Sequence, residues 1–223
     1  IISGGWDAMS DYFMELFEGL FDASVSSAAF KPHGTPRYNL GHSEGLQNLG
    51  PQQDEILKVD KRLFHTELNQ LMGYFSKLDA FVFFQLIQLA YDNAIGEPSN
   101  KKLLFYHIHN PSIIANINFV TLAPDSEYLI IVREPIQSCE SWIQKEFSKN
   151  DYAACTSKII KMLFEIDDVI YSTTNSIGVR LEDIKERPQK TMLTLCDWLD
   201  IQDHESIYKM TAQGKKWWGD PSS

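Results

Sequence analysis

The stretch YLIIVREPIQSCESWI, residues 128–143, decides the fold. Glu127–Val132 is a short apolar run of the kind that forms a strand buried on both faces of a parallel sheet. Arg133 and Glu134 follow, and then Pro135, a residue type favoured in the first turn of a helix. The sequence therefore predicts a buried strand that leads, through a short polar turn, into a helix ending near Lys149.

The same alternation of strands and helices extends on both sides of this stretch. Further strands are predicted at Ile1–Ser3, Leu103–His109 and Ile177–Leu181. Apolar residues at helical spacing predict helices at Met9–Phe21, twice within Asp54–Ile95, and at Pro111–Leu122, Asp151–Ser172 and Lys190–Leu199. Strands separated by helices favour an α/β fold with a central parallel sheet covered on both faces. Ser24–Gln53, rich in Gly, Pro, Ser and Asn, is predicted to be a long functional loop.

Composition narrows the class of protein. The 223 residues, 43% of them hydrophobic, suit a single domain over residues 1–223. Because 20 Lys+Arg stand against 30 Asp+Glu, the net charge of −10 argues against a nucleic-acid-binding surface. Three scattered cysteines and the lack of an apolar run long enough for a membrane span favour a soluble, cytoplasmic protein with reduced thiols. Because no initiator Met is present, the sequence is expected to be a portion of a longer protein.

The residues that follow each predicted strand are candidate site residues, because ligands of parallel α/β sheets bind beyond the carboxyl ends of the strands. Arg133 leaves the sheet where a helix begins, and a guanidinium beside a helix N-terminus suits a phosphate. Ser141, two turns into that helix, adds a hydroxyl donor if the turn brings it back toward Arg133. The alternative is that Arg133 pairs with Glu134 or with another surface carboxylate.

Two other polar segments are candidates for chemistry. Alternation places His107 and His109 on one face of their predicted strand, and His109 at its end suits a general base. Each is more commonly a hydrogen-bonded core histidine, and a metal site is disfavoured because no third ligand follows at a recognisable spacing. Lys215 and Lys216, beside tryptophans in GKKWWGD, suit an anion, or else this segment is a surface loop pinned by its aromatic side chains.

Together these segments resemble the sulfotransferases that use 3′-phosphoadenosine-5′-phosphosulfate. The segment YLIIVREPIQSCESWI is similar to the family's 3′-phosphate motif. That motif consists of a hydrophobic strand, an Arg, a Pro two residues after the Arg and a Ser eight residues after it. The resemblance implies that Arg133 and Ser141 bind the 3′-phosphate. GVRLEDIKERPQKTMLTLCDWLDI, residues 178–201, resembles the family's R-x-E-D segment, which identifies scaffold more than chemistry. GKKWWGD resembles the basic loop that closes over the same phosphate, which implies a role for Lys215 and Lys216.

The remaining motifs of that family are less complete. YHIHNP resembles its K-T-H-x-P segment and puts His109 at the position of the catalytic base, with His107 in place of the lysine. The loop for the 5′-phosphosulfate has no clear copy. By order it would be GGWDAMSD, residues 4–11, where Ser10 matches the hydroxyl residue but Asp7 stands where a cation is wanted. KPHGTPR, residues 31–37, is discounted as this loop because no strand precedes it, although its Lys31 and Arg37 can still reach the site.

The resemblance implies a P-loop-like three-layer α/β/α fold and a metal-free transfer of a sulfuryl group from 3′-phosphoadenosine-5′-phosphosulfate to an acceptor hydroxyl. The nucleotide product would be 3′-phosphoadenosine-5′-phosphate. His109 would take the hydroxyl proton, and Glu44 in GHSEGL is the alternative base. The residues expected to bind the nucleotide are Arg133, Ser141, Lys215, Lys216 and Ser10.

The sequence does not choose between two classes of acceptor, a small molecule and a carrier-bound hydroxyl. The Ser24–Gln53 loop and the apolar Phe81–Leu89 helix are expected to shape its pocket. Two other functions compete with the transferase. One is a catalytically impaired domain of the same fold that binds the nucleotide without the 5′ loop. The other is a small-metabolite kinase, which requires a Walker-type loop and a magnesium-binding acid that this sequence does not show.

Overall fold

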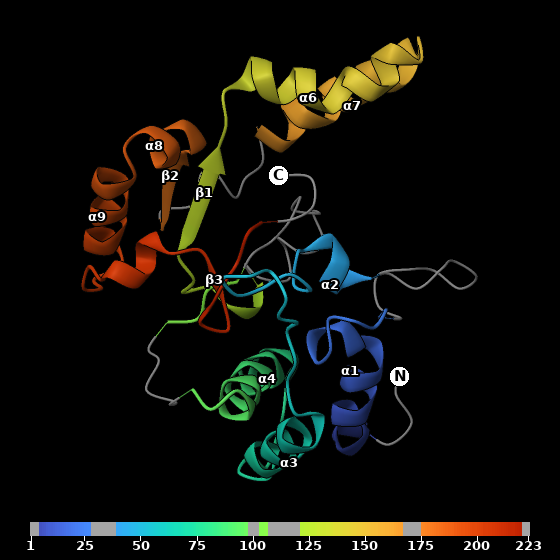
Figure 1. Cartoon of the computed structure of the whole chain (residues 1–223), viewed down its shortest axis with the longest axis vertical. Coiled ribbons are helices and arrows are strands. Elements are labelled where there is room, and N and C mark those ends of the chain that lie inside the picture. The colour runs from blue at the N-terminus through green and yellow to red at the C-terminus, as the bar shows by residue number, and fades with distance from the viewer. Residues whose placement is uncertain (1–4, 28–38, 98–102, 107–120, 167–174, 220–223) are drawn as a thin grey trace. The chain divides into compact units, whose positions relative to one another are not determined.

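The computed structural model describes residues 5–27, 39–97, 103–106, 121–166 and 175–219 (Figure 1). The chain divides into two compact units, one built from residues 1–107 and 209–223 and the other from residues 108–208. Both helices and strands are present, and the strands include a small two-stranded parallel sheet. This mixture is compatible with the predicted α/β class.

Helices dominate the first unit. Its 3-10 turns are Gly5–Ala8 and Glu18–Leu20, and its α-helices are α1 (Met9–Leu16), α2 (Leu40–Ser43), α3 (Lys61–Met72) and α4 (Ala80–Ala94). Aspartates begin the two longest helices. Asp60 accepts hydrogen bonds from the first free amides of α3 at 2.8 and 3.1 Å, and Asp79 caps α4 in the same way. The two helices predicted within Asp54–Ile95 are confirmed.

Aromatic rings pack at the centre of the first unit. Phe64 of α3 is fully buried, and its ring centroid lies 4.8 Å from that of Phe21 and 5.9 Å from that of Phe13. Tyr91 of α4 donates its hydroxyl to the carbonyl of Leu20 at 2.7 Å, and burial raises the pKa of this tyrosine to about 12. Helices α1, α3 and α4 are therefore held by one shared core.

The N-terminal helix is shorter than predicted. The helix expected over Met9–Phe21 ends at Leu16 and gives way to the 3-10 turn Glu18–Leu20. Within that turn the amide of Gly19 donates to the buried hydroxyl of Ser27 at 2.7 Å, a bond that ties the chain to the start of the predicted loop.

The prediction of a strand over Leu103–His109 is wrong for the part of this range that the structure describes. Leu103–Tyr106 is neither helix nor strand, and its four side chains are exposed. Apolar composition alone does not make a strand, because the backbone also needs a neighbouring strand to complete its hydrogen bonds, and no described strand pairs with this segment. The strand predicted at Ile1–Ser3 and all but the end of the helix predicted at Pro111–Leu122 lie outside the described residues.

The second unit contains the parallel sheet. Strand β1 (Tyr128–Val132) pairs in parallel with β2 (Ser176–Arg180), in a register that sets Val132 opposite Arg180. Between them come α6 (Pro135–Ser148) and α7 (Tyr152–Ile166), and after them α8 (Leu181–Glu186) and α9 (Pro188–Trp198). The strand–helix corner at Pro135 and the parallel pairing are confirmed. Short α8, directly after β2, was not predicted.

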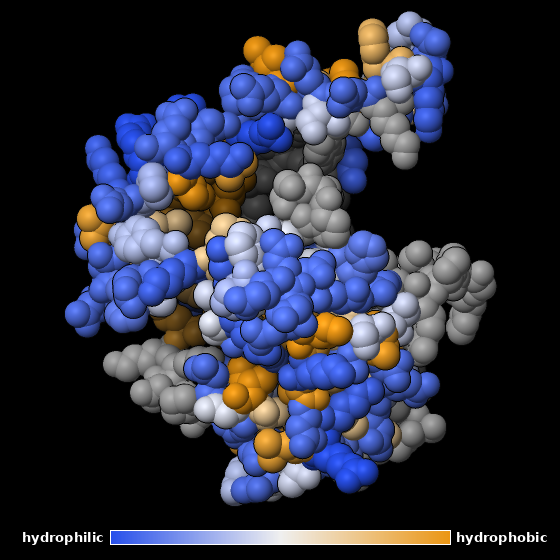
Figure 2. Space-filling model, in the orientation of Figure 1, coloured by the Kyte–Doolittle hydropathy of each residue, from blue (hydrophilic) through white to orange (hydrophobic). Residues whose placement is uncertain are grey.

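The predicted burial of β1 holds only in part. Ile131 is 57% exposed and Val132 is 44% exposed, whereas the first three residues of the strand are half-buried. Helices α6 and α7 pack side by side and are joined by the short turn 149–151, in which Asn150 has φ of 59° (Figure 1). Hydrophobic side chains lie among hydrophilic ones on the visible face of this helix pair (Figure 2).

Candidate functional site

The carboxyl ends of β1 and β2 form one corner of the second unit. Because the strands are parallel and in the same register, the residues that follow them, Arg133 and Leu181, leave the same edge of the sheet. Two residues separate the end of β1 from the start of α6, and α8 begins directly after β2. This edge is the one that the order of strands and helices in the sequence predicted.

Arg133 presents an exposed side chain at this corner. No ion pair joins it to the adjacent carboxylate of Glu134, whose Oε2 caps α6 by accepting a hydrogen bond from the amide of Gln137 at 2.6 Å. Among the described side chains, no ion pair includes Arg133. The alternative that Arg133 is held by its neighbour is thus not what the structure shows.

Glu182 of α8 contacts the same corner, and the sequence did not single it out. Its Oε1 accepts a hydrogen bond from the amide of Glu134 at 3.0 Å, and its Oε2 lies 3.7 Å from Nε of Arg180. The hydrogen bond from the Glu134 amide is the main cause that lowers the pKa of Glu182, assisted by its own amide and by the charges of Arg180 and Arg133. The carboxylate is therefore kept ionised.

Ser141 lies two turns into α6, on the helix that Arg133 precedes, and its side chain is exposed. Because Glu134 already binds the amide of Gln137, an anion at this helix start would depend on side chains more than on the amides of the first turn. Arg133 is the leading candidate among them, and Ser141 is the hydroxyl that the sequence pattern assigns to the same site.

Lys215 and Lys216 belong to the first unit, in a short hairpin. Strands β3 (Thr211–Ala212) and β4 (Lys215–Lys216) are antiparallel and joined by Gln213 and Gly214, which both have positive φ, 51° and 71°. Two positive φ values suit the tight turns that join hairpin strands. The sequence pattern predicted a basic loop here and not a hairpin.

Both lysines have partners within this unit. Nζ of Lys215 lies 2.7 Å from Oε2 of Glu55, and Nζ of Lys216 lies 3.3 Å from the ring centroid of Trp218. The indole of Trp218 in turn donates to the carbonyl of Gly50 at 2.7 Å. The alternative of a segment pinned by its aromatic side chains therefore describes this hairpin well.

No protein-family model matches this chain, and no curated protein or solved structure matches it either. Any assignment of function therefore rests on the residues and their geometry.

Glu44, the alternative base, lies at the end of α2 and has an exposed side chain. Its backbone carbonyl accepts a hydrogen bond from the indole of Trp217 at 2.8 Å. The next residue, Gly45, has φ of +65°, and a Cβ placed there would lie 2.0 Å from the carbonyl oxygen of Gly219. The Glu44 turn and the C-terminal segment are thus in direct contact.

Replacing Gly45 by alanine should release the C-terminal segment. The added methyl group meets backbone and strains a left-handed conformation, so trypsin is expected to cleave after Lys216 about tenfold faster. Gly96→Ala is the matched control, because Gly96 has φ of +76° but open space around it. Equal cleavage rates in the two variants would show that Gly219 does not hold this turn.

Ser10 lies on α1 and is fully buried. Its hydroxyl donates to Oδ1 of Asn69 at 3.0 Å, and the Asn69 amide lies 3.0 Å from Nε2 of His65. A contact between Ser10 and a nucleotide would require Asn69 to release this hydroxyl first. Asp7, just before α1, has no described side chain.

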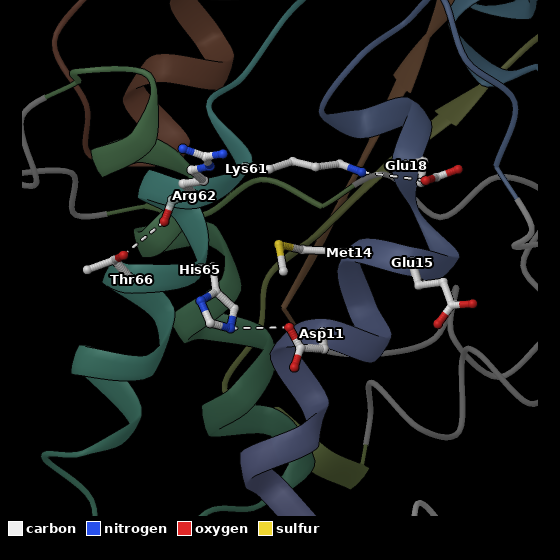
Figure 3. A pocket seen from close by; sticks show the side chains of 8 residues that line it. All are labelled: Asp11, Met14, Glu15, Glu18, Lys61, Arg62, His65 and Thr66. Atoms are coloured by element: carbon white, nitrogen blue, oxygen red, sulfur yellow. Dashed lines mark hydrogen bonds and ion pairs between the residues drawn. The ribbon is translucent and has the colours of Figure 1, made fainter.

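A pocket of about 470 Å³ lies beside this network, between α1 and α3 (Figure 3). Lys61 reaches across it toward Glu18, with 3.6 Å between Nζ and Oε1, and Nε2 of His65 lies 3.2 Å from Oδ1 of Asp11. The side chain of Met14 projects between these two pairs. Glu18 and Asp11 therefore each have a basic partner across the pocket.

Four of the residues that the sequence predicted for the site belong to segments outside the described part of the chain. His107, His109, Lys31 and Arg37 lie outside the described residues. In the part of the chain that is described, no group of three or more His, Cys, Asp or Glu side chains is arranged to hold a metal ion. No described helix is long and apolar enough to cross a membrane.

Part of the α4 face that was expected to shape the acceptor pocket packs in the core instead. Phe83, Leu86 and Ile87 are buried in the core of the first unit with Phe64. Of the expected Ser24–Gln53 loop, the described part contains α2 and is anchored by fully buried Leu49.

Proposed function

We propose that this chain binds a 3′-phosphorylated adenine nucleotide at the corner where β1 leads into α6, and that it transfers the sulfuryl group of 3′-phosphoadenosine-5′-phosphosulfate to an acceptor hydroxyl. One observation supports the proposal most. Arg133 stands exposed at the carboxyl end of a parallel strand, while the carboxylate of Glu134 is engaged by the helix instead. A guanidinium in that position suits a phosphate monoester, which it can bind through two parallel hydrogen bonds.

In the proposed reaction the acceptor oxygen attacks sulfur, and the bond between sulfur and the bridging phosphate oxygen breaks. His109 takes the proton of the acceptor hydroxyl as the new bond forms. The nucleotide leaves as 3′-phosphoadenosine-5′-phosphate, which the protein holds through its 3′-phosphate by Arg133 and Ser141. Lys215 and Lys216 are engaged by Glu55 and Trp218, and the proposed site does not require them.

A second candidate is a domain that binds the nucleotide without transfer. The burial of Ser10 favours this second candidate. Ser10 is the residue matched to the 5′ loop, but it lies fully buried on a helix, and its hydroxyl is hydrogen-bonded to Asn69. The donor and product nucleotides bind alike in this case, and no acceptor is sulfated.

Calorimetric titration with 3′-phosphoadenosine-5′-phosphate tests the shared part of both candidates. The wild-type chain is expected to bind in the micromolar range. Arg133→Ala should weaken binding by about 10- to 100-fold, because a charge-assisted bond to the phosphate is lost. Arg62→Ala, an exposed arginine at the start of α3, is the matched control and should bind like wild type. No binding by the wild type, or an equal loss in both variants, would refute the proposed site.

Incubation with sulfur-labelled donor and a panel of hydroxyl acceptors separates the two candidates. Label transferred to any acceptor establishes the transferase. If the nucleotide binds but no label is transferred to phenols, sugars, lipids or carrier-bound hydroxyls, the second candidate, a nucleotide-binding domain without transfer, is favoured.

A further inference from the structure

We propose that Glu182 is a positioning residue of this anion site: one carboxylate oxygen fixes the corner that presents Arg133, and the negative charge competes with the incoming phosphate for the two arginines there. This inference rests on the proposed function. It assigns a role to a residue that the sequence pattern marks only as scaffold.

The fixing contact joins segments that are far apart in the sequence. Oε1 of Glu182 accepts the amide hydrogen of Glu134 at 3.0 Å, across a separation of 48 residues. Glu134 is the residue between Arg133 and the first turn of α6. A carboxylate held at that amide therefore limits how far the Arg133 backbone can turn away from the sheet edge.

The second oxygen carries the competing charge. Oε2 of Glu182 is buried, and no described residue donates a hydrogen bond to it. Its partner is the guanidinium of Arg180, with Nε at 3.7 Å, which is an ion-pair distance but longer than a hydrogen bond. The charges of Arg180 and Arg133 both help to lower the pKa of Glu182, which shows that the two cations lie within electrostatic reach of this carboxylate.

The charges of the corner consequently cancel. Arg133 and Arg180 are positive, whereas Glu134 and Glu182 are negative, and Glu134 is engaged at the start of α6. A phosphate that approaches Arg133 meets the field of the Glu182 carboxylate, and like charges in a partly dry corner repel each other. Removal of that one charge leaves a net positive corner while the Glu134 amide still needs an acceptor.

Glu182→Gln separates the two roles of this side chain. The glutamine carbonyl can still accept the bond from Glu134, but the competing charge is gone. We expect 3′-phosphoadenosine-5′-phosphate to bind the Glu182→Gln variant about fivefold more tightly than the wild type, the scale of one partly exposed ion pair. Inorganic pyrophosphate should show the same direction. Glu182→Ala removes the acceptor as well and should bind more weakly than Glu182→Gln.

Glu186→Gln is the matched control, because Glu186 is exposed on the same short helix and the substitution changes the net charge equally. It should bind the nucleotide as the wild type does. Unchanged or lower affinity of Glu182→Gln for the nucleotide would overturn the inference, because a merely structural role predicts that result. The proposed function would still stand in that case, provided that the wild-type chain binds the nucleotide. Equal tightening in the control would also overturn it. No binding by either the wild type or Glu182→Gln would refute both proposals.

Discussion

Phe64→Ala is expected to lower the free energy of unfolding of the first unit by about 3 to 5 kcal/mol, the usual cost of truncating a buried aromatic side chain. Phe64 has no exposed surface, and its ring packs on those of Phe13, Phe21 and Tyr91. These partners come from α1, the turn after it, and α4, so the cavity would open where three elements meet. Urea denaturation followed by circular dichroism measures the change.

Phe75→Ala is the control for this prediction. The same side chain is removed just after the end of α3, where it is 45% exposed, so the loss should stay below about 1 kcal/mol. Similar losses for Phe64 and Phe75 would contradict the core described for this unit.

The strand–helix corner could be predicted because each part of it has a local signal. The apolar run Tyr128–Val132 indicates a strand, and the proline at position 135 indicates a helix start, all within eight residues. The cap formed by Glu134 was not predicted. Leu103–Tyr106 has an equally apolar composition but is exposed and belongs to no described strand. Whether an apolar run becomes a strand depends on a partner elsewhere in the chain, and that information is not local.

In the candidate site too, features with a local signal could be predicted, whereas contacts between distant segments could not. The position of Arg133 at the sheet edge could be predicted because it follows a strand, whereas the contact between Glu182 and the Glu134 amide spans 48 residues and has no sequence signature of its own. The partners of the hairpin lysines, Glu55 and Trp218, could not be predicted either. A cluster of lysines indicates a candidate anion site, but the nearest carboxylate and ring decide whether the charges are available to a ligand.

The hairpin at 211–216 was missed for a related reason. Its turn residues, Gln213 and Gly214, both adopt positive φ, but only the glycine favours that conformation intrinsically. Asn-Gly or Asp-Gly would have signalled the turn. Here the strands are only two residues long, and the hydrogen bonds of Trp217 and Trp218 to Glu44 and Gly50 support the hairpin from outside.

His109→Ala is expected to lower sulfuryl transfer by about 10²- to 10⁴-fold, the usual contribution of a general base, and to leave the affinity for 3′-phosphoadenosine-5′-phosphate unchanged. In the proposed reaction, proton removal from the acceptor matters only in the transfer step, whereas binding of the product nucleotide depends on Arg133. The rate at which the acceptor hydroxyl is sulfated and calorimetry on the same preparation measure the two quantities separately. This separation distinguishes a lost base from a disrupted fold.

Glu44→Ala is the companion variant, because Glu44 is the alternative base. Its carboxylate is exposed, and its described link to the C-terminal segment is the backbone carbonyl that accepts the Trp217 indole, which alanine retains. Turnover should therefore stay near the wild-type value. A large loss in Glu44→Ala together with normal turnover in His109→Ala would transfer the role of base to the glutamate. A fall in nucleotide affinity in His109→Ala would instead make the histidine part of the binding site, since a base that acts only on the acceptor hydroxyl has no contact with the product nucleotide.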